Sequence, residues 1–480
     1  MNIHKEAAMG IKWQFCASLI EKVISFLTTI ILARILGPSN YGLFALGLLI
    51  VNFFGIFKSL GIESALIQRK HNLDKALNTA FCIIPIFSLI LYLLLNFTAP
   101  IIAKFLNNSD LVQVIRMLGI IFIFWSLSRV PLTILEKDMH FAKISFIEVI
   151  GALVFSILAV ILAISGFGVW SLVYGLIAKT VISTIFVWIF AKWKPRFIFD
   201  IKIALELFNF SKFVFLGYFF WALKANLDNF LVGKILGVEM LGLYAVAFGI
   251  ANVVIDYFAG KVFRVIYPAY SKLQGNLEEL KTTFLKVLKL AALFALPFAF
   301  GVYALGYEFL NFAYGEKWLG ALRILKILTL GGVFTTLSTT AEPIFLALGK
   351  TKITFFVASF QVAAFFIFIK PFASKFGLDG VGYVVTSAAF VAMVFNFYLA
   401  RKLLSLNIKE IYFSLKSSIL CSLLMMLCII CFKSFIPIFI RDFSIKFLFV
   451  LSFFIGLIVY LYSIKKEEKS FLKEIKSLVF

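Results

Sequence analysis

Charged side chains inside long apolar stretches are the residues of this chain that are best suited to chemistry. Lys22, Lys58, Lys224 and Arg264 all fall within such stretches. A charge at the centre of a membrane helix costs at least about 2.5 kcal/mol on insertion scales, so it normally faces a bundle interior or a water-filled cavity. Ammonium and guanidinium groups donate strong hydrogen bonds to phosphate oxygens. The four cations therefore predict a cavity that binds an anionic headgroup, such as a lipid diphosphate.

Acidic residues also occur in these stretches, but they are fewer than the basic ones, which also include Arg116, Arg129, Lys179 and Lys261. Glu21, Asp228, Asp256 and Glu342 are the candidates for a proton or sodium site that could drive transport. The sequence does not favour one of them over the others. The excess of basic over acidic positions makes a cavity for cationic molecules the less favoured interpretation.

Each cation also has a structural interpretation that the sequence leaves open. Lys58 and Arg264 could extend to the membrane surface, because long basic side chains bury their stems and keep their charges in water. Lys22 could pair with a neighbouring acid. Lys224 and Asp228 lie one helical turn apart and could form an ion pair that only stabilises the helix. The net basic excess is therefore a firmer basis for inference than any single residue.

Composition places the chain among membrane proteins. Of its 480 residues, 62% are hydrophobic and only 15% are charged, which is more apolar surface than a soluble domain can bury. The formal net charge is +22, but the basic residues gather in short loops between apolar runs, so membrane topology explains them better than nucleic-acid binding does. The five cysteines and three histidines show no disulfide framework and no metal-ligand spacing. No metal or other cofactor is expected.

The apolar runs predict an all-α polytopic protein with about fourteen spans, each long enough to cross roughly 30 Å of hydrocarbon. Loops rich in lysine and arginine alternate with poor ones, and the positive-inside rule then places both termini in the cytoplasm. The predicted spans are 13–36, 42–67, 78–100, 112–135, 144–165, 168–191, 211–236, 241–266, 286–310, 320–347, 353–373, 379–401, 414–437 and 445–464.

A motif that occurs twice predicts an internal repeat. Residues 36–45 and 236–245 both read L-G-x-x-x-x-G-L-aromatic-A, and a basic residue, Arg34 or Lys234, precedes each copy. Glycine permits tight reversals and close helix contact, so each copy fits a hairpin between two membrane helices. The paired hairpin glycines are Gly37, Gly42, Gly237 and Gly242. A second pair of similar stretches, 166–174 and 375–383, keeps the same order.

The repeat predicts two six-helix bundles with parallel topology, related by a pseudo-twofold axis along the membrane normal. The predicted N-terminal lobe is 1–196 and the C-terminal lobe is 197–405. Two further membrane helices occupy 406–464, and a basic amphipathic tail occupies 465–480 on the cytoplasmic side. Surface helices are also expected at 199–207 and 276–290.

Known catalytic motifs are missing from the sequence. It contains no phosphate-binding loop of the G-x-x-x-x-G-K-[ST] type, no G-x-S-x-G and no H-E-x-x-H. No predicted outer loop is long enough to hold a glycosyl-transfer site. A membrane polymerase or ligase is therefore disfavoured, and the chain is not expected to be an enzyme.

Residues 31–44 and 60–69 resemble the N-terminal signature of bacterial polysaccharide-export flippases, the Wzx-like O-antigen and exopolysaccharide translocases. These belong to the multidrug/oligosaccharidyl-lipid/polysaccharide superfamily. The resemblance implies translocation of a polyprenyl-diphosphate-linked oligosaccharide from the cytoplasmic to the outer leaflet of the bacterial inner membrane. It also implies two lobes that work by alternating access around a cationic cavity.

This resemblance implies partners and further residue roles. The substrate would be an undecaprenyl-diphosphate type lipid bearing a sugar chain, and Trp125 and Trp221 are candidates to contact the sugars. Assembly partners would be a polysaccharide polymerase and chain-length proteins, with no nucleic acid, and the chain is expected to work as a monomer. The alternative is a cation-coupled small-molecule exporter of the same superfamily.

Overall fold

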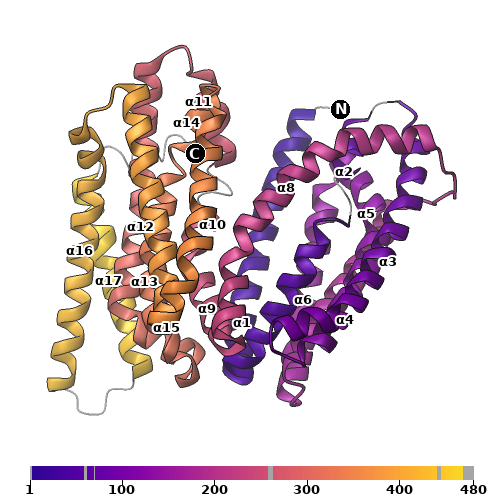
Figure 1. Ribbon diagram of the computed structural model, residues 1–480. Coiled ribbons are helices and arrows are strands. Elements are labelled where there is room, and N and C mark those ends of the chain that lie inside the picture. The colour runs from indigo at the N-terminus through magenta and orange to yellow at the C-terminus, as the bar shows by residue number, and fades with distance from the viewer. Residues whose placement is uncertain (1–2, 59–61, 70, 258–262, 440–444, 469–480) are drawn as a thin grey trace. The chain divides into compact units, whose positions relative to one another are not determined.

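Helices make up almost all of the regular structure. The computed structural model describes residues 3–58, 62–69, 71–257, 263–439 and 445–468, and no strand occurs among them (Figure 1). The side chains at 3–16, 68, 210–225, 256–257, 263–265, 351, 355, 436–439 and 445–446 are outside the description. Contacts divide the chain into an N-terminal unit, Met1–Gly242, and a C-terminal unit, Leu243–Phe480. The predicted lobe boundaries at 196, 405 and 464 remain predictions.

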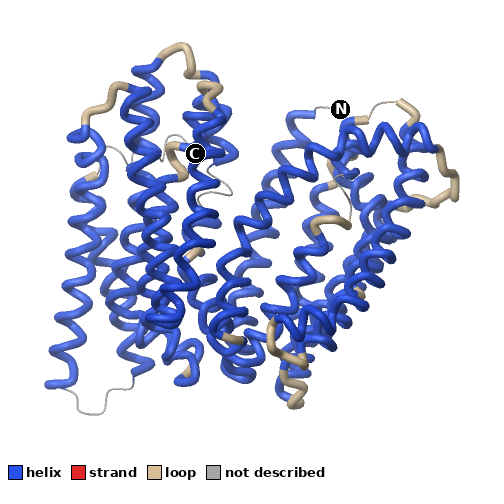
Figure 2. The backbone as a smooth tube through the Cα atoms, in the orientation of Figure 1, coloured by secondary structure: helices blue, strands red, loops and turns tan. Residues whose placement is uncertain are grey.

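The N-terminal unit consists mostly of long helices joined by short connections (Figure 2). The helix α1 packs against α4, α6 and α7, while α5 packs against α3 and α7. The helices of this unit are α1 (Ile3–Gly55), α2 (Ile62–Gln68), α3 (Leu73–Phe105), α4 (Leu111–Gly119), α5 (Ile121–Lys137), α6 (Phe141–Ile164), α7 (Val169–Ala191) and α8 (Ile201–Leu236).

The helix α9 (Val238–Ala251) begins in the N-terminal unit and continues into the C-terminal unit. In the C-terminal unit, α12 packs against α13, α16 and α17, and α13 packs against α15. The remaining elements are α10 (Val253–Tyr257), α11 (Phe263–Lys272), α12 (Leu277–Phe309), the π-helix η2 (Leu310–Tyr314), the 3-10 helix η3 (Glu316–Ala321), α13 (Leu322–Ser338), α14 (Glu342–Ala347), α15 (Thr351–Leu404), α16 (Ile408–Phe439) and α17 (Ile445–Glu467).

The prediction of a polytopic all-α membrane protein is confirmed at the level of fold class. Nine helices of the described chain are long and apolar enough to cross a membrane. One of these, Lys352–Leu404 within α15, covers the two predicted spans 353–373 and 379–401. The chain kinks between the two spans, at Gly377. The count of fourteen spans and the repeat symmetry remain predictions.

Among the described residues, four predicted spans are interrupted rather than continuous: 42–67, 112–135, 241–266 and 320–347. The predicted span 42–67 is split, since α1 ends at Gly55 and α2 begins at Ile62. In the predicted span 241–266, α9 ends at Ala251 and the short helix α10 begins at Val253. Average hydropathy predicts only that a segment is apolar, whereas a helix also requires an unbroken series of backbone hydrogen bonds. In these two spans the second piece starts a new, short helix.

Glycine backbones support the hairpin interpretation of the repeated motif. Gly37 has φ 75° and ψ 174°, and its counterpart Gly237 has φ 88° and ψ −180°. The second pair agrees as well, with φ 55° at Gly168 and 59° at Gly377. Residues with a Cβ rarely adopt these angles, so glycine is required at each turn. Each paired landmark thus has the same local backbone shape.

The two motif copies contact one another within the N-terminal unit. A Cβ added at Gly42 would lie 1.7 Å from the carbonyl oxygen of Val238. A Cβ added at Gly242 would lie 2.0 Å from the carbonyl oxygen of Pro38. The contact is therefore reciprocal: the glycine of each copy meets the carbonyl at the equivalent place in the other. Only glycine lets the two backbones approach so closely.

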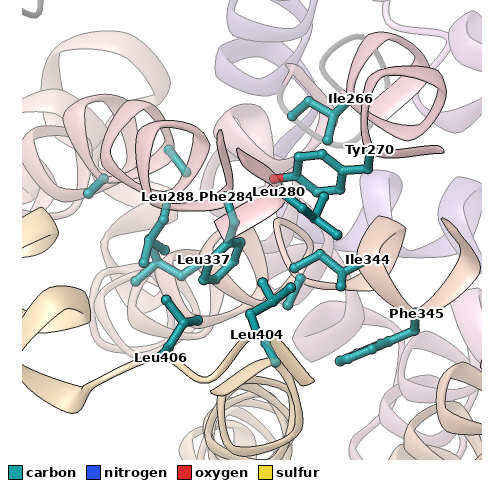
Figure 3. Close-up of a cluster of buried hydrophobic side chains, with 14 of the residues drawn as sticks. Ile266, Tyr270, Leu280, Phe284, Leu288, Leu337, Ile344, Phe345, Leu404 and Leu406 are labelled. Atoms are coloured by element: carbon teal, nitrogen blue, oxygen red, sulfur yellow. The ribbon is translucent and has the colours of Figure 1, made fainter. Parts of the chain in front are cut away.

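The core of the C-terminal unit forms where five helices meet (Figure 3). Tyr270 of α11, Phe284 of α12 and Phe345 of α14 are fully buried there. Leu337 of α13 and Leu404 of α15 also belong to the cluster. Their burial fixes the ends of these helices against one another.

The helices α16 and α17 correspond to the two predicted additional membrane helices. Both pack against α12. The Tyr460 hydroxyl of α17 donates to the Leu293 carbonyl at 2.7 Å. Lys433 of α16 forms an ion pair with Glu308, whose side chain is only 8% exposed. The polar contacts act together with a buried apolar cluster that includes Met425 and Ile429. The predicted tail beyond residue 468 lies outside the described residues.

Candidate functional site

Polar side chains gather in the N-terminal unit where α1 ends. Lys58 follows the last turn of α1 and is half-buried. Its Nζ lies 4.0 Å from the centroid of the Trp125 ring, in the geometry of a cation–π contact. The structure therefore brings together one predicted phosphate ligand and one predicted sugar contact.

Trp125 shares one face of α5 with two charged residues. Arg129 lies one turn further along, and its guanidinium carbon is 5.8 Å from the Trp125 ring centroid. Glu136 lies two further turns along. Residues spaced by three, four and seven positions share a helix face, so α5 presents an aromatic ring, a cation and a carboxylate in a row.

Arg129 has its charge balanced by two carboxylates. Its Nε lies 2.8 Å from Oε1 of Glu63 on α2, and its Nη1 lies 3.5 Å from Oε1 of Glu136. The Glu63 side chain is only 10% exposed. A buried carboxylate needs such a partner, because an unpaired charge in a low-dielectric interior is costly.

Lys58 differs from Arg129, because none of the described carboxylates forms an ion pair with it. Glu63 and Glu136 both bond to Arg129 instead. An aromatic ring offers a cation only about 0.5 to 2 kcal/mol. The ammonium of Lys58 is therefore held in position while its hydrogen-bond donors remain able to bind an anion.

Apolar packing and one lysine position this group. Trp125 packs against a buried cluster from α2, α3, α5 and α8, which includes Leu66 and Val130. The Lys137 ammonium donates to three carbonyls at the end of α2, those of Leu66 at 3.0 Å, Ile67 at 2.8 Å and Arg69 at 2.6 Å. These satisfy the last carbonyls of α2, which have no partner within the helix.

The other predicted residues of α1 lie elsewhere. Glu21, a predicted coupling residue, forms an ion pair with Lys179 of α7 at 3.1 Å. Lys22 is exposed on the surface of the described chain and has interactions of its own. Lys22 lies in the interior of α1, whereas Lys58 follows the end of that helix. The predicted common cavity for these two cations remains untested.

The remaining predicted ligands are distributed over several helices. Asp228 is 3% exposed and accepts a hydrogen bond from the Asn229 backbone at 2.8 Å. Glu342 begins α14 and also has interactions. The side chains of Lys224, Trp221, Asp256 and Arg264 lie outside the described residues. The roles assigned to these residues remain predictions.

The basic residues before the hairpins have surface positions. Lys234 lies over the Phe105 ring, with Nζ 3.6 Å from its centroid, and donates to the Phe105 carbonyl. Arg34 is exposed and has interactions as well. The contacts of Lys234 favour its alternative role as an anchor for the hairpin.

The ion pairs of Arg129 are what sequence reasoning missed. Arg129 was recognisable as a charge within an apolar stretch, and Glu63 occurs in residues 60–69. The available signal was the presence of opposite charges in two predicted spans, 42–67 and 112–135. Glu136 and Lys137 lie just after the predicted span 112–135, where loop charges are common. No group of His, Cys, Asp or Glu in the described part of the chain could hold a metal ion.

The amino-acid sequence is similar to a known protein family over more than half of its length. Residues 31–323, more than half of the chain, match the model of a family described as polysaccharide biosynthesis protein. The teichuronic acid biosynthesis protein TuaB of Bacillus subtilis (strain 168) is 27% identical over 416 residues, which cover 85% of this chain and 84% of TuaB. The lipopolysaccharide biosynthesis protein WzxC of Escherichia coli (strain K12) is 23% identical, over 77% of this chain and 75% of WzxC.

Solved structures share the fold. The lipid II flippase MurJ, in an inward closed conformation, superposes with a TM-score of 0.76 over 96% of this chain and 99% of MurJ, at 17% identity. A multidrug resistance transporter of the MATE family, in an inward-facing conformation, gives a TM-score of 0.61 over 80% of this chain and 94% of the transporter, at 19% identity. At these identities the likeness concerns the fold alone.

Proposed function

Since this chain belongs to the polysaccharide biosynthesis protein family, as its resemblance to polysaccharide-export flippases predicted, we propose that it translocates a lipid-linked oligosaccharide across a membrane. The lipid would be a polyprenyl diphosphate of the undecaprenyl type. The headgroup would move from the cytoplasmic to the outer leaflet of a bacterial inner membrane, by alternating access. The product would supply the assembly of a surface polysaccharide.

The relatives support the class of substrate. TuaB and WzxC are named for the biosynthesis of teichuronic acid and of lipopolysaccharide, and MurJ is a flippase for lipid II. The first two resemble this chain over about three quarters or more of its length. Because MurJ shares the fold over almost the whole chain, a lipid-linked headgroup is a substrate that this architecture can accommodate.

The arrangement around Lys58 is the observation that carries the proposal. Its ammonium lies 4.0 Å from the Trp125 ring, while the nearby Arg129 is paired with Glu63 and Glu136. A diphosphate would be the anionic partner of Lys58, because its oxygens would accept charge-assisted hydrogen bonds from the ammonium. Trp125 would orient the ammonium, and its predicted contact with sugars remains a proposal.

Flipping of a labelled headgroup in proteoliposomes tests the function. The purified chain would be reconstituted with a polyprenyl-diphosphate oligosaccharide, and exposed sugar would be scored with a glycosidase that cannot cross the bilayer. We expect sugar to become accessible only in vesicles that contain the protein. Equal accessibility in protein-free vesicles would contradict the proposal.

A cation-coupled exporter of small molecules is the alternative function. Its support is the similarity in fold to a MATE-family transporter. The two functions predict different phenotypes. Loss of an exporter should raise drug susceptibility and leave surface polysaccharide intact, whereas loss of a flippase should remove the polysaccharide. The proposed flippase function has four further parts. They are ion-coupling roles for Glu21, Asp228, Asp256 and Glu342, cytoplasmic termini, function as a monomer, and assembly with a polysaccharide polymerase and chain-length proteins.

A further inference from the structure

The connection between α7 and α8 exposes an unusual run of apolar side chains. Phe197 is 86% exposed, Phe199 is 56% exposed and Ile201 is 59% exposed. Leu205 and Phe208, on the first turns of α8, are 56% and 48% exposed. We refer to residues 192–208 as the connecting segment. So much exposed apolar area on one short segment marks an interaction site.

Four cations alternate with these apolar residues. Lys192, Lys194, Arg196 and Lys202 are all exposed, and none of them has an ion-pair partner within the described chain. The two acids of the segment are occupied: Asp200 caps α8 by accepting from the backbone of Lys202 and Ile203, at 2.9 and 3.2 Å. Glu206 forms an ion pair with Arg69 at 2.9 Å.

Hydrogen bonds and packing hold the other side of the connecting segment against the N-terminal unit. The Arg196 backbone donates to the Asn78 side chain at 2.5 Å, and the Asp200 backbone donates to Thr79 at 3.2 Å. Ile203 and Leu207 are buried in the cluster that includes α2 and α3. Figure 1 shows the first part of α8 lying across the end of this unit. The orientation of the exposed face is therefore fixed.

We propose that the connecting segment is a binding site for anionic phospholipids of the leaflet in which it lies. Phenylalanine rings would insert between acyl chains, and the four cations would bind lipid phosphates. The positive-inside rule predicts that this is the cytoplasmic leaflet, where anionic lipids attract basic segments. The proposal concerns a second ligand and does not depend on the flipping activity.

The interleaving of charge and apolar surface distinguishes a lipid from a soluble anion. Inorganic phosphate or pyrophosphate could bind the cations, but it would leave Phe197 and Phe199 in water. A phospholipid satisfies both kinds of group, because its phosphate and its acyl chains lie next to each other. Basic residues near an anionic surface contribute about 1 kcal/mol each, which corresponds to roughly fivefold in binding per cation.

A probe attached to the segment tests the proposal. Leu205→Cys would be labelled with a fluorophore in a full-length background with its five native cysteines replaced by serine. The protein would be placed in phosphatidylcholine nanodiscs that contain either brominated phosphatidylglycerol or brominated phosphatidylcholine at equal mole fraction. We expect the anionic lipid to quench the fluorophore with at least about fivefold preference over the zwitterionic lipid.

Two charge variants make the test specific. The variant K192Q/K194Q/R196Q/K202Q should lose the preference, so that both lipids quench equally. The matched control K272Q/K350Q/K352Q/K402Q removes four other exposed cations and should retain the preference. Equal quenching by both lipids in the parent protein would overturn the proposal, and so would the same loss of preference in both charge variants.

Two further experiments test insertion of the apolar face and competition by a soluble anion. Phe199→Ser should reduce quenching by both brominated lipids, because the segment would lie less deeply among acyl chains; unchanged quenching by both lipids would contradict insertion of the apolar face. Inorganic pyrophosphate should leave the lipid preference unchanged. Displacement of phosphatidylglycerol by pyrophosphate would assign the cations to a soluble anion and overturn the proposal.

Discussion

Lys58 and Arg129 are neighbouring cations with different surroundings. Arg129 is bonded to two carboxylates, so its charge contributes to the structure of the unit. Lys58 is placed against the Trp125 ring, which weakly favours its charge and accepts no conventional hydrogen bond. Substitutions at the two positions should consequently affect different properties, activity in one case and stability in the other.

Lys58→Gln should reduce headgroup flipping at least about tenfold, because hydrogen bonds to charged groups contribute roughly 1.5–3 kcal/mol. Thermal stability should change little, since no ion pair is lost. The measurement is the initial rate of sugar exposure in proteoliposomes, next to Lys75→Gln, which removes an exposed cation at the start of α3. Wild-type flipping by Lys58→Gln would disprove the assigned role.

Glu63→Gln should destabilise the protein by roughly 3 kcal/mol, because it removes one carboxylate of a largely buried pair and leaves Arg129 with Glu136 alone. Unfolding in detergent, followed by heat or denaturant, measures the change. Asp74→Asn, at an exposed acid of α3, serves as the control and should lie close to the parent. If both variants unfold alike, the Arg129–Glu63 bond has no stabilising role.

The sequence could identify charges within apolar stretches but could not match them into pairs. Glu63 and Arg129 are 66 residues apart, and only helix packing brings them to 2.8 Å. Lys137 illustrates the same limit. It lies between two predicted spans, where the sequence indicates only a loop cation, yet its ammonium binds three carbonyls at the end of α2. Such contacts depend on where helices end, which is the least certain feature of a sequence-based prediction.

At the scale of elements, hydropathy located most spans and missed the interruptions within four of them. The segment after Gly55 is apolar enough to pass as part of a continuous membrane helix, yet α1 ends there and a new helix begins at Ile62. The separate helix α2 carries Glu63, which bonds to Arg129 on α5.

The attachment of α16 to α12 can be tested with a pair of variants. Lys433→Met should destabilise the protein by roughly 3–5 kcal/mol, because it leaves the buried Glu308 carboxylate without a cation. The double variant K433M/E308Q should recover most of this loss, since no uncompensated charge remains. Differential scanning of the detergent-purified protein reports both values.

The control for this pair is Lys416→Met, at an exposed position of the same helix. It should leave the unfolding temperature unchanged. A double variant as unstable as Lys433→Met would show that the ion pair itself, and not merely the avoidance of a buried charge, holds α16 in place.

At the scale of the whole molecule, composition and motifs were sufficient for the class and the family. Apolar content predicted a polytopic α-helical protein, and the signature around Arg34 and Gly37 predicted the family that the chain was found to match. Neither could predict which cations share a cavity. That depends on the mutual placement of helices distant in sequence, to which hydropathy and local motifs are insensitive.

The contact between the two hairpin motifs provides a prediction at this scale. Gly42→Ala and Gly242→Ala should each destabilise the protein by about 1–3 kcal/mol, because the new methyl group would overlap a carbonyl oxygen. Gly249→Ala is the matched control on α9, where a Cβ meets nothing within 4 Å. It should be neutral or slightly stabilising, since alanine favours helices over glycine. Equal unfolding temperatures for all three variants would contradict the close approach.

The reciprocity of this contact makes it isologous, as in a dimer of identical subunits that meet across a twofold axis. Gly42 approaches Val238, and Gly242 approaches Pro38, so each copy of the motif supplies the surface that the other requires. Once one alanine has pushed the two backbones apart, the second finds part of its space already open. A double-mutant cycle should therefore show that G42A/G242A costs less than the sum of the single changes. One short motif, present twice in a chain, thus suffices to build both sides of a self-complementary joint.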